Sequence, residues 1–158
     1  MTARLNLFSD PTATAAKAAT HFGSASRTVL TESTLPPSTQ QLVLLRVSQL
    51  NGDGYGTDVW SKNAARAGED AARLALLPVW RESTVFTDVE RAALELVEQG
   101  TRLSDGGVTD EAWAVAASYY DEAQLADLVM LVSLMNATNR MALIVRQRGG
   151  AYTPEGAA

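Results

Sequence analysis

The chain of 158 residues contains no cysteine and a single histidine, His21. The absence of cysteine excludes disulfide bonds, thiolate catalysis and metal sites built on sulfur. One histidine is also too few for an ordinary zinc cluster. The sequence therefore predicts a protein without sulfur redox chemistry, and we expect neither a metal nor a cofactor.

Basic residues are few, since 13 Lys and Arg stand against 18 Asp and Glu and the net charge is −5. Such a chain lacks the basic face that nucleic acid requires. The longest strongly apolar stretch, residues 128–135, is far shorter than the roughly 18 residues of a membrane-spanning helix. The first residues lack the apolar core of a signal peptide. We therefore expect a cytoplasmic protein with no nucleic-acid and no membrane partner.

The apolar pattern is helical throughout, without alternating strands joined by a hairpin signal. It predicts helices over residues 11–23, 38–51, 53–67, 69–77, 87–99, 109–119 and 121–147, and a short segment at 78–82. Residues 24–37 are predicted to be a Ser/Thr-rich connection. Ser38 and Thr87 each precede Gln or Glu by three residues, which is the spacing of a capping box.

This order of elements predicts an all-α bundle of about seven or eight helices. The chain length fits one domain, which we place at residues 1–148. The Gly/Ala/Pro-rich residues 149–158 are predicted to form a flexible C-terminal tail.

Three ordered segments carry a family resemblance. Residues 41–63 read QLVLLRVSQLNGDGYGTDVWSKN. They resemble the signature of the carboxymuconolactone decarboxylase and alkylhydroperoxidase D-like family, which runs Glu, eleven residues, Cys-x-x-Cys, three residues, His. Residues 73–103 and 131–145 resemble the middle region and the final helix of that family. The resemblance implies an alkylhydroperoxidase D-like helical bundle that forms a homo-oligomer, as a dimer, trimer or hexamer.

The positions that carry the redox chemistry of that family are all replaced. Gln41 stands at the Glu position, Asp53 and Gly56 at the two Cys positions, and Trp60 at the His position. A peroxidase of this family uses a thiolate at a helix N-terminus and a second cysteine that resolves the oxidised sulfur. The resemblance therefore implies the fold, whereas the replacement of both cysteines excludes thiol peroxidase activity.

Three of the replacements fall on one face of a predicted helix, because Asp53, Gly56 and Trp60 are spaced i, i+3 and i+7. The resemblance implies that this face lines a substrate pocket. A carboxylate, a missing side chain and an aromatic wall suit a small, flat aromatic molecule. We predict that Asp53 is a general base, Trp60 a stacking wall and Gly56 a position cleared for the substrate.

Four more residues complete the predicted site. Gln41 and Tyr55 are predicted to be catalytic with Asp53, each as a donor to an anion that develops on the substrate. Met135 and Thr138, in the final helix, are predicted to contact the substrate.

Simpler structural roles stay open for three of these residues. Asp53 follows Gly52 at a helix start and can be an N-cap. Gln41 can be the capping-box partner of Ser38. Trp60 can be ordinary core.

Three functions fit the pattern. The first is a redesigned scaffold, an engineered general-base lyase that resembles designed Kemp eliminases and has no peroxidase activity. The second is a natural cysteine-free pseudoenzyme of the family that binds a small aromatic or acidic ligand. The third is a structural or interaction protein whose pocket is filled by Trp60.

Overall fold

The computed structural model describes residues 3–7 and 9–154, and within them the chain forms seven α-helices, two short 3₁₀ helices and no strand. The α-helices are α1 (Thr14–Glu32), α2 (Pro37–Asn51), α3 (Gly54–Arg66), α4 (Ala71–Leu76), α5 (Asp88–Thr101), α6 (Asp110–Ala117) and α7 (Glu122–Val145). The 3₁₀ helices are η1 (Leu77–Glu82) and η2 (Leu103–Asp105). The predicted all-α bundle is confirmed.

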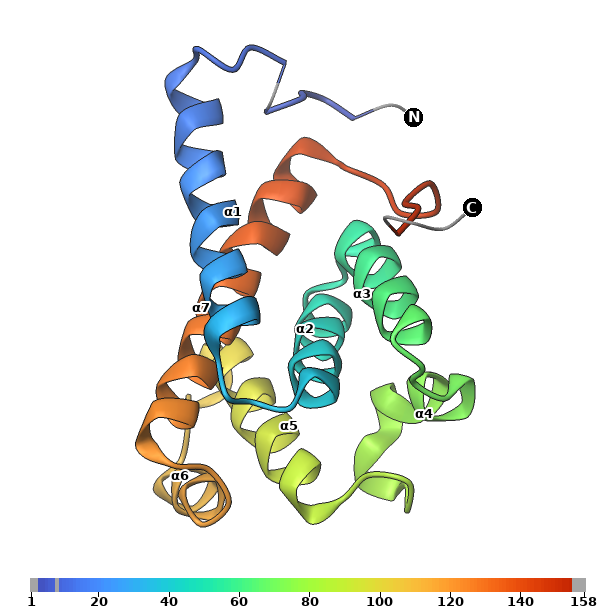
Figure 1. The fold of residues 1–158 in the computed structure, drawn as a ribbon, viewed down its shortest axis with the longest axis vertical. Coiled ribbons are helices and arrows are strands. Elements are labelled where there is room, and N and C mark those ends of the chain that lie inside the picture. The colour runs from blue at the N-terminus through green and yellow to red at the C-terminus, as the bar shows by residue number, and fades with distance from the viewer. Residues whose placement is uncertain (1–2, 8, 155–158) are drawn as a thin grey trace.

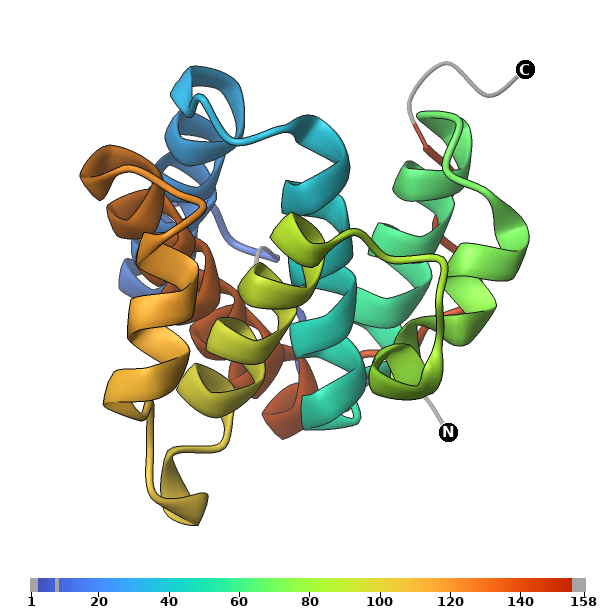
Figure 2. The same ribbon diagram turned by 90° about the horizontal axis from the view of Figure 1, so that it is seen from below.

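Helix α2 lies at the centre of the bundle. It packs against α3, α5 and α7, and α7 also packs against α1, α5 and α6. Figure 1 shows α1 running along α7 on one side of the molecule, with α3 and α4 on the other side and α2 between them. In the view of Figure 2, α2 and α5 lie side by side in the middle. The end of α2 therefore leads directly into α3 beside the long helix α7.

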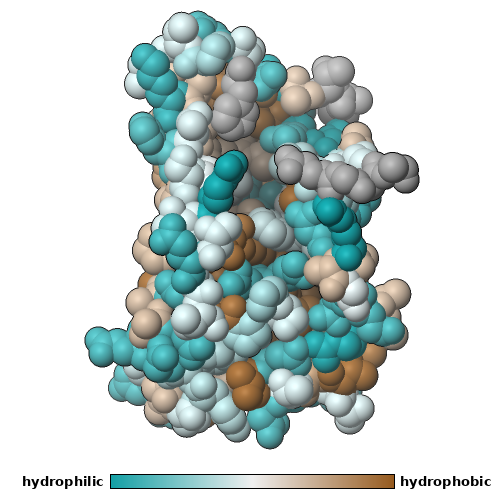
Figure 3. Space-filling model, viewed as in Figure 1, coloured by the Kyte–Doolittle hydropathy of each residue, from teal (hydrophilic) through white to brown (hydrophobic). Residues whose placement is uncertain are grey.

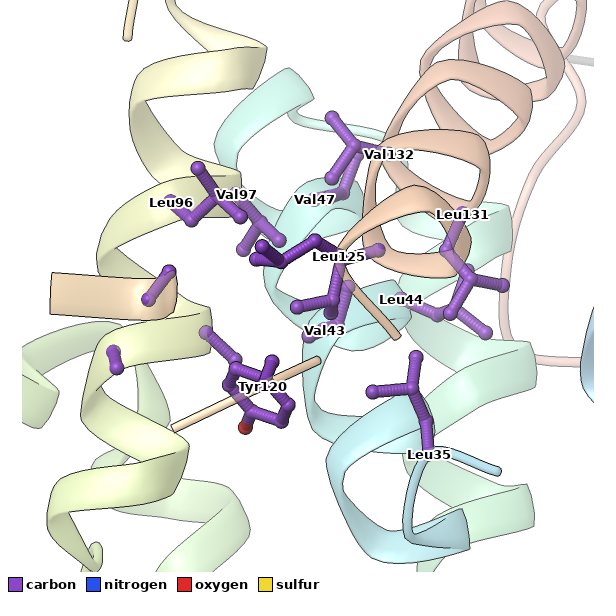
Figure 4. Close-up of a cluster of buried hydrophobic side chains, with 14 of the residues drawn as sticks. Leu35, Val43, Leu44, Val47, Leu96, Val97, Tyr120, Leu125, Leu131 and Val132 are labelled. Atoms are coloured by element: carbon purple, nitrogen blue, oxygen red, sulfur yellow. The ribbon is translucent and has the colours of Figure 1, made fainter. Parts of the chain in front are cut away.

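The main apolar core lies between α2, α5 and α7 (Figure 4). Val43 and Val47 of α2, Val97 of α5 and Leu128 of α7 are among its fully or almost fully buried members. Burial of one such side chain contributes about 1.5–3 kcal/mol relative to leaving it exposed. This packing fixes the position of α2, and with it the loop at residues 52–53 that opens α3.

By length and composition alone, α7 is apolar enough to cross a membrane. Its buried face packs against α1, α2, α5 and α6, however, and the core helix of a helical bundle has the same length and composition. The helix is thus accounted for by the core, and the absence of a membrane partner stays a prediction.

The first helix begins at Thr14, later than the predicted Pro11, but it is longer than the sequence predicts because it continues to residue 32. The Ser/Thr-rich segment joins the helix because Val29 and Leu30 pack against the core. Its hydroxyls are satisfied within the helix by carbonyl groups one turn earlier. For example, Ser24 Oγ donates to the carbonyl of Thr20 at 3.0 Å. The predicted connection over residues 24–37 therefore shrinks to residues 33–36.

One of the two predicted capping boxes forms. Thr87 Oγ1 accepts from the backbone N–H of Glu90 at 3.3 Å, and the Glu90 carboxylate accepts from the backbone N–H of Thr87 at 2.8 Å. The predicted box of Ser38 and Gln41 is wrong, because α2 begins at Pro37 with no side-chain cap. Proline suits the first helical turn, where an N–H would have no partner within the helix.

The C-terminal tail is held against α3 over the part that the structure describes. Asp58 Oδ2 accepts from the backbone N–H groups of Gly150 at 2.6 Å and Tyr152 at 3.1 Å. Lys62 Nζ donates to the carbonyl of Tyr152 at 2.8 Å. The hydrogen bond from Lys62, aided by the two backbone donors and opposed by partial desolvation, lowers the pKa of Asp58 from its ordinary value. Residues 155–158 of the predicted flexible tail lie outside the described residues.

We expect Thr87→Ala to lower the free energy of unfolding by about 1 kcal/mol, because it removes the side-chain acceptor at the start of α5. Ser38→Ala is the control and should change this free energy by less than about 0.5 kcal/mol, since no cap hydrogen bond is lost. Urea unfolding followed by circular dichroism measures both variants. An equal loss in the two variants would contradict the assignment of the caps.

Candidate functional site

A cavity of about 320 Å³ lies between α1, α3 and α7. Figure 3 shows the surface hollowed between α1 and α3, with hydrophobic residues at the floor of the hollow. The apolar lining residues are Leu7, Ala19, Phe22, Gly23, Leu30, Leu44, Gly56, Val59, Trp60, Leu131, Leu134, Met135, Met141 and Ala142. The volume falls at the lower end of the roughly 300–1,000 Å³ of small-molecule sites, which favours a small ligand.

The polar lining is sparse and carries no positive charge. It consists of Ser26, Asp53, Tyr55, Thr138 and Gln147. None of the described lining residues is Lys, Arg or His. The hydroxyl of Thr138 donates to the carbonyl of Leu134 at 2.8 Å and is engaged within its own helix. Across residues 3–7 and 9–154, no group of three or more His, Cys, Asp or Glu side chains lies together as metal ligands.

Asp53 is both the N-cap of α3 and a buried part of the cavity wall. Its Oδ1 accepts from the backbone N–H of Tyr55 at 3.0 Å, and its Oδ2 accepts from Nδ2 of Asn139 at 2.7 Å. The residue is only 1% exposed. The two roles that the sequence offers as alternatives, cap and pocket residue, therefore belong to the same carboxylate.

A buried polar cluster holds this carboxylate in place. Asn139 is 0% exposed; its Nδ2 also contacts Ser48 Oγ at 3.3 Å, and its Oδ1 accepts from Asn51 Nδ2 at 3.0 Å. Ser48 in turn donates to the carbonyl of Leu44 at 2.9 Å. No buried side-chain N or O atom of the described residues lacks a hydrogen-bond partner. The cluster thus ties α2 and α7 to the first turn of α3 with its polar groups satisfied.

Gly56 makes room for that cluster. A Cβ at this position would lie 2.6 Å from Ser48 Oγ, 2.7 Å from Asp53 Oδ2 and 2.8 Å from Asn139 Nδ2. Such distances are far below van der Waals contact. The sequence predicts that Gly56 clears space for a substrate, but protein side chains take that space, although Gly56 also borders the cavity.

Trp60 lies where the core meets the cavity. It packs against both apolar clusters of the core, and its Nε1 donates to Sδ of Met135 at 3.1 Å. This weak hydrogen bond to a soft sulfur acceptor fixes the indole. The indole borders the cavity without filling it, so Trp60 is part of the core and of the cavity wall, and its stacking on a substrate stays a prediction.

Six of the seven predicted site residues border this one cavity: Asp53, Tyr55, Gly56, Trp60, Met135 and Thr138. Gln41 is the exception, because it lies half-buried on α2 and is not a lining residue. A catalytic role of Gln41 in this cavity is therefore not supported by its position.

Other site residues escape the sequence reasoning. Phe22 and Ser26 line the cavity from α1, which the sequence predicts to end at residue 23. Ser48 and Asn139 support Asp53 from α2 and α7. Their signal is a polar residue within an otherwise apolar helix face, since a buried polar group needs a hydrogen-bond partner.

The seven-helix bundle, with a cavity beside the α2–α3 junction, has the alkylhydroperoxidase D-like architecture. The sequence model of the carboxymuconolactone decarboxylase family matches residues 13–99, which is more than half of the chain. The chain belongs to the carboxymuconolactone decarboxylase family.

Relatives and solved structures agree with this assignment. The uncharacterized protein YdfG of Bacillus subtilis is 32% identical over 120 residues, which cover 76% of this chain and 82% of YdfG. The uncharacterized protein YnjA of Escherichia coli is 29% identical over 78% of this chain and 68% of its own length. The crystal structure of an Agrobacterium tumefaciens protein of unknown function, proposed to be an antioxidant defence protein AhpD, superposes with a TM-score of 0.87. It is 25% identical, and the match covers 96% of this chain and 100% of that one.

Gly56→Ala should lower the free energy of unfolding by about 1–3 kcal/mol, because the added methyl group overlaps the buried polar cluster. Gly23→Ala, in the middle of α1, is the matched control, since nothing lies within 4 Å of the new Cβ. It should raise the free energy of unfolding by about 0.4–1 kcal/mol, because alanine restricts the unfolded chain. Chemical denaturation measures both, and a Gly56→Ala protein as stable as Gly23→Ala would contradict the close packing at Gly56.

Proposed function

We propose that this protein binds a small, flat aromatic molecule in the cavity between α1, α3 and α7, without sulfur redox chemistry. The observation that carries the proposal is a mostly apolar cavity bordered by a fixed indole, Trp60, and a buried carboxylate, Asp53. Sites for small molecules typically combine an apolar lining with a few polar groups that set orientation. An aromatic ligand gains about 0.5–1.5 kcal/mol from a well-placed ring beyond the burial of its surface.

A protein of the same fold gives support by analogy. The debrominase Bmp8 superposes with a TM-score of 0.76 at 19% identity, over 84% of this chain and 71% of that one, and was crystallised with 2,3,4-tribromopyrrole. That ligand is a small flat ring. At this identity the likeness concerns the fold, so it supports the size and shape of the proposed ligand and not a shared reaction.

Two further expectations belong to the proposal. A homo-oligomer, as a dimer, trimer or hexamer, would cover apolar side chains that α7 exposes, among them Leu143 and Ile144. A cytoplasmic location also stays a prediction.

The test fills the cavity from α1. Ser26 lines the cavity, whereas Ser24 is exposed on the same helix and does not line it. We expect the unaltered protein to bind 4-chlorophenol in isothermal titration calorimetry, and Ser26→Trp to weaken this binding by at least about tenfold, which is 1.4 kcal/mol. Ser24→Trp is the control and should bind like the parent. Absence of binding by the parent, or equal binding by the Ser26→Trp protein, would contradict the proposal.

A second candidate function is proton abstraction by Asp53, as in a Kemp elimination. It is favoured by the burial of Asp53 at the cavity wall, because a base shielded from water is what such a reaction requires. Trp60 would hold the aromatic substrate. Tyr55, which borders the cavity, would donate to the developing anion in place of Gln41, which does not.

We expect turnover of 5-nitrobenzisoxazole by the unaltered protein to fall by about 10²–10⁴-fold in Asp53→Asn, because the base is lost while the helix cap is kept. Ring opening is followed by the absorbance of the phenolate product. Circular dichroism and urea unfolding of the same variant show that the fold is intact. A parent without activity, or a variant as active as the parent, would reject the base and leave the binding proposal standing.

A further inference from the structure

We infer that the cavity selects an uncharged aromatic molecule carrying an O–H or N–H group directed at Asp53, and that it rejects aromatic carboxylates. This inference rests on the proposed function and adds the charge and polarity of the ligand. The sequence allows either an aromatic or an acidic ligand, and the inference favours the uncharged aromatic one.

The charge of the cavity lining disfavours an anionic ligand. Asp53 and Tyr55 are the ionisable residues among the described lining residues, and none of the others is basic. A carboxylate ligand would therefore be buried beside the Asp53 carboxyl group with no Lys, Arg or His to pair with it. Burial of a charge without a partner costs several kcal/mol, more than the stacking of one ring returns.

The helix N-terminus does not offset this cost. The start of α3 carries a partial positive charge of about +0.5 elementary charge, which elsewhere attracts anions. Here Asp53 already occupies that position, because its Oδ1 accepts the backbone N–H of Tyr55 at 3.0 Å. The anion that the helix N-terminus favours is thus part of the protein, and a second anion would be repelled by the first.

The hydrogen-bonding groups of the lining also favour a neutral ligand that donates a hydrogen bond. A carboxylate has about four acceptor positions. The described hydrogen bonds use one for Tyr55 N–H and one for Asn139 Nδ2, so about two acceptor positions of this cavity-bordering residue are unused by the protein. Two potential donors to an anionic ligand are already engaged, since Trp60 Nε1 donates to Met135 Sδ and the Thr138 hydroxyl to its own helix.

The neutral hydroxyls of Ser26 and Tyr55 are the remaining side-chain donors near α1 and α3, and Gln147 offers an amide. These donors carry no positive charge, so they do not neutralise the charge of a buried carboxylate ligand. They suit an uncharged polar group better than a carboxylate. The site therefore favours a ligand that donates to Asp53 and carries no negative charge.

The test compares three one-ring ligands at pH 7 by isothermal titration calorimetry: 4-chlorophenol, 4-chloroanisole and 4-chlorobenzoate. Loss of the donor in 4-chloroanisole should weaken binding by at least about tenfold relative to 4-chlorophenol. The anion 4-chlorobenzoate should show no binding at concentrations where 4-chlorophenol saturates the protein. In Asp53→Asn, the preference for 4-chlorophenol over 4-chlorobenzoate should shrink by at least about tenfold.

A second variant, which should gain binding of an anion, tests the inference even if Asp53→Asn fails to fold. Gln147 is exposed and borders the cavity, so Gln147→Lys adds a cation without touching the buried cluster. We expect this variant to bind 4-chlorobenzoate, which the unaltered protein should reject; a variant that still rejects 4-chlorobenzoate contradicts the argument from the charge of the lining. Binding of 4-chlorobenzoate or 4-chloroanisole by the unaltered protein as tight as that of 4-chlorophenol overturns the inference and leaves the proposed function intact. Absence of binding by all three ligands overturns both.

Discussion

The hydrogen bond between Asn139 Nδ2 and Asp53 Oδ2 is the contact on which the candidate site depends. It joins the C-terminal half of α7 to the N-cap of α3, and Asn51, at the end of α2, bonds to the same amide of Asn139. Gly56 is required because a side chain there would displace these groups. A buried polar group without a partner costs about 1–3 kcal/mol. The cluster of Ser48, Asn51, Asp53 and Asn139 therefore stabilises one arrangement of the three helices as a unit. The cavity beside them takes its shape from that arrangement.

The same arrangement explains how the fold of the family is kept without the redox groups. A helix N-terminus stabilises negative charge whether it comes from sulfur or oxygen. Asp53 stands where a family signature has its first cysteine, and it accepts the N–H of Tyr55 as an N-cap. The fold thus keeps an anionic group at this helix start while thiol chemistry is impossible. What remains is a cavity whose wall combines a carboxylate with the indole of Trp60.

The sequence predicts the bundle and most of the cavity wall because helix periodicity determines which residues share a face. Asp53 and Trp60 meet at the cavity for that reason. Periodicity does not determine how one helix is rotated against another, so Gln41, at the correct spacing from Asp53, lies outside the lining. The length of α1 depends on the packing of Val29 and Leu30 against the core, whereas the Ser/Thr-rich composition alone predicts a loop there. The role of Gly56 depends on neighbours from α2 and α7, which no local pattern reveals.

The most direct test of the account is a crystal structure of the protein soaked with 4-bromophenol, because the anomalous signal of bromine locates the ligand without reference to the shape of its electron density. We expect a bromine peak inside the cavity between α1 and α3, with the ring against Trp60. The phenol oxygen should lie within hydrogen-bond distance, about 2.5–3.0 Å, of a carboxylate oxygen of Asp53. An empty cavity, or a ligand whose hydroxyl group points away from Asp53, would contradict it.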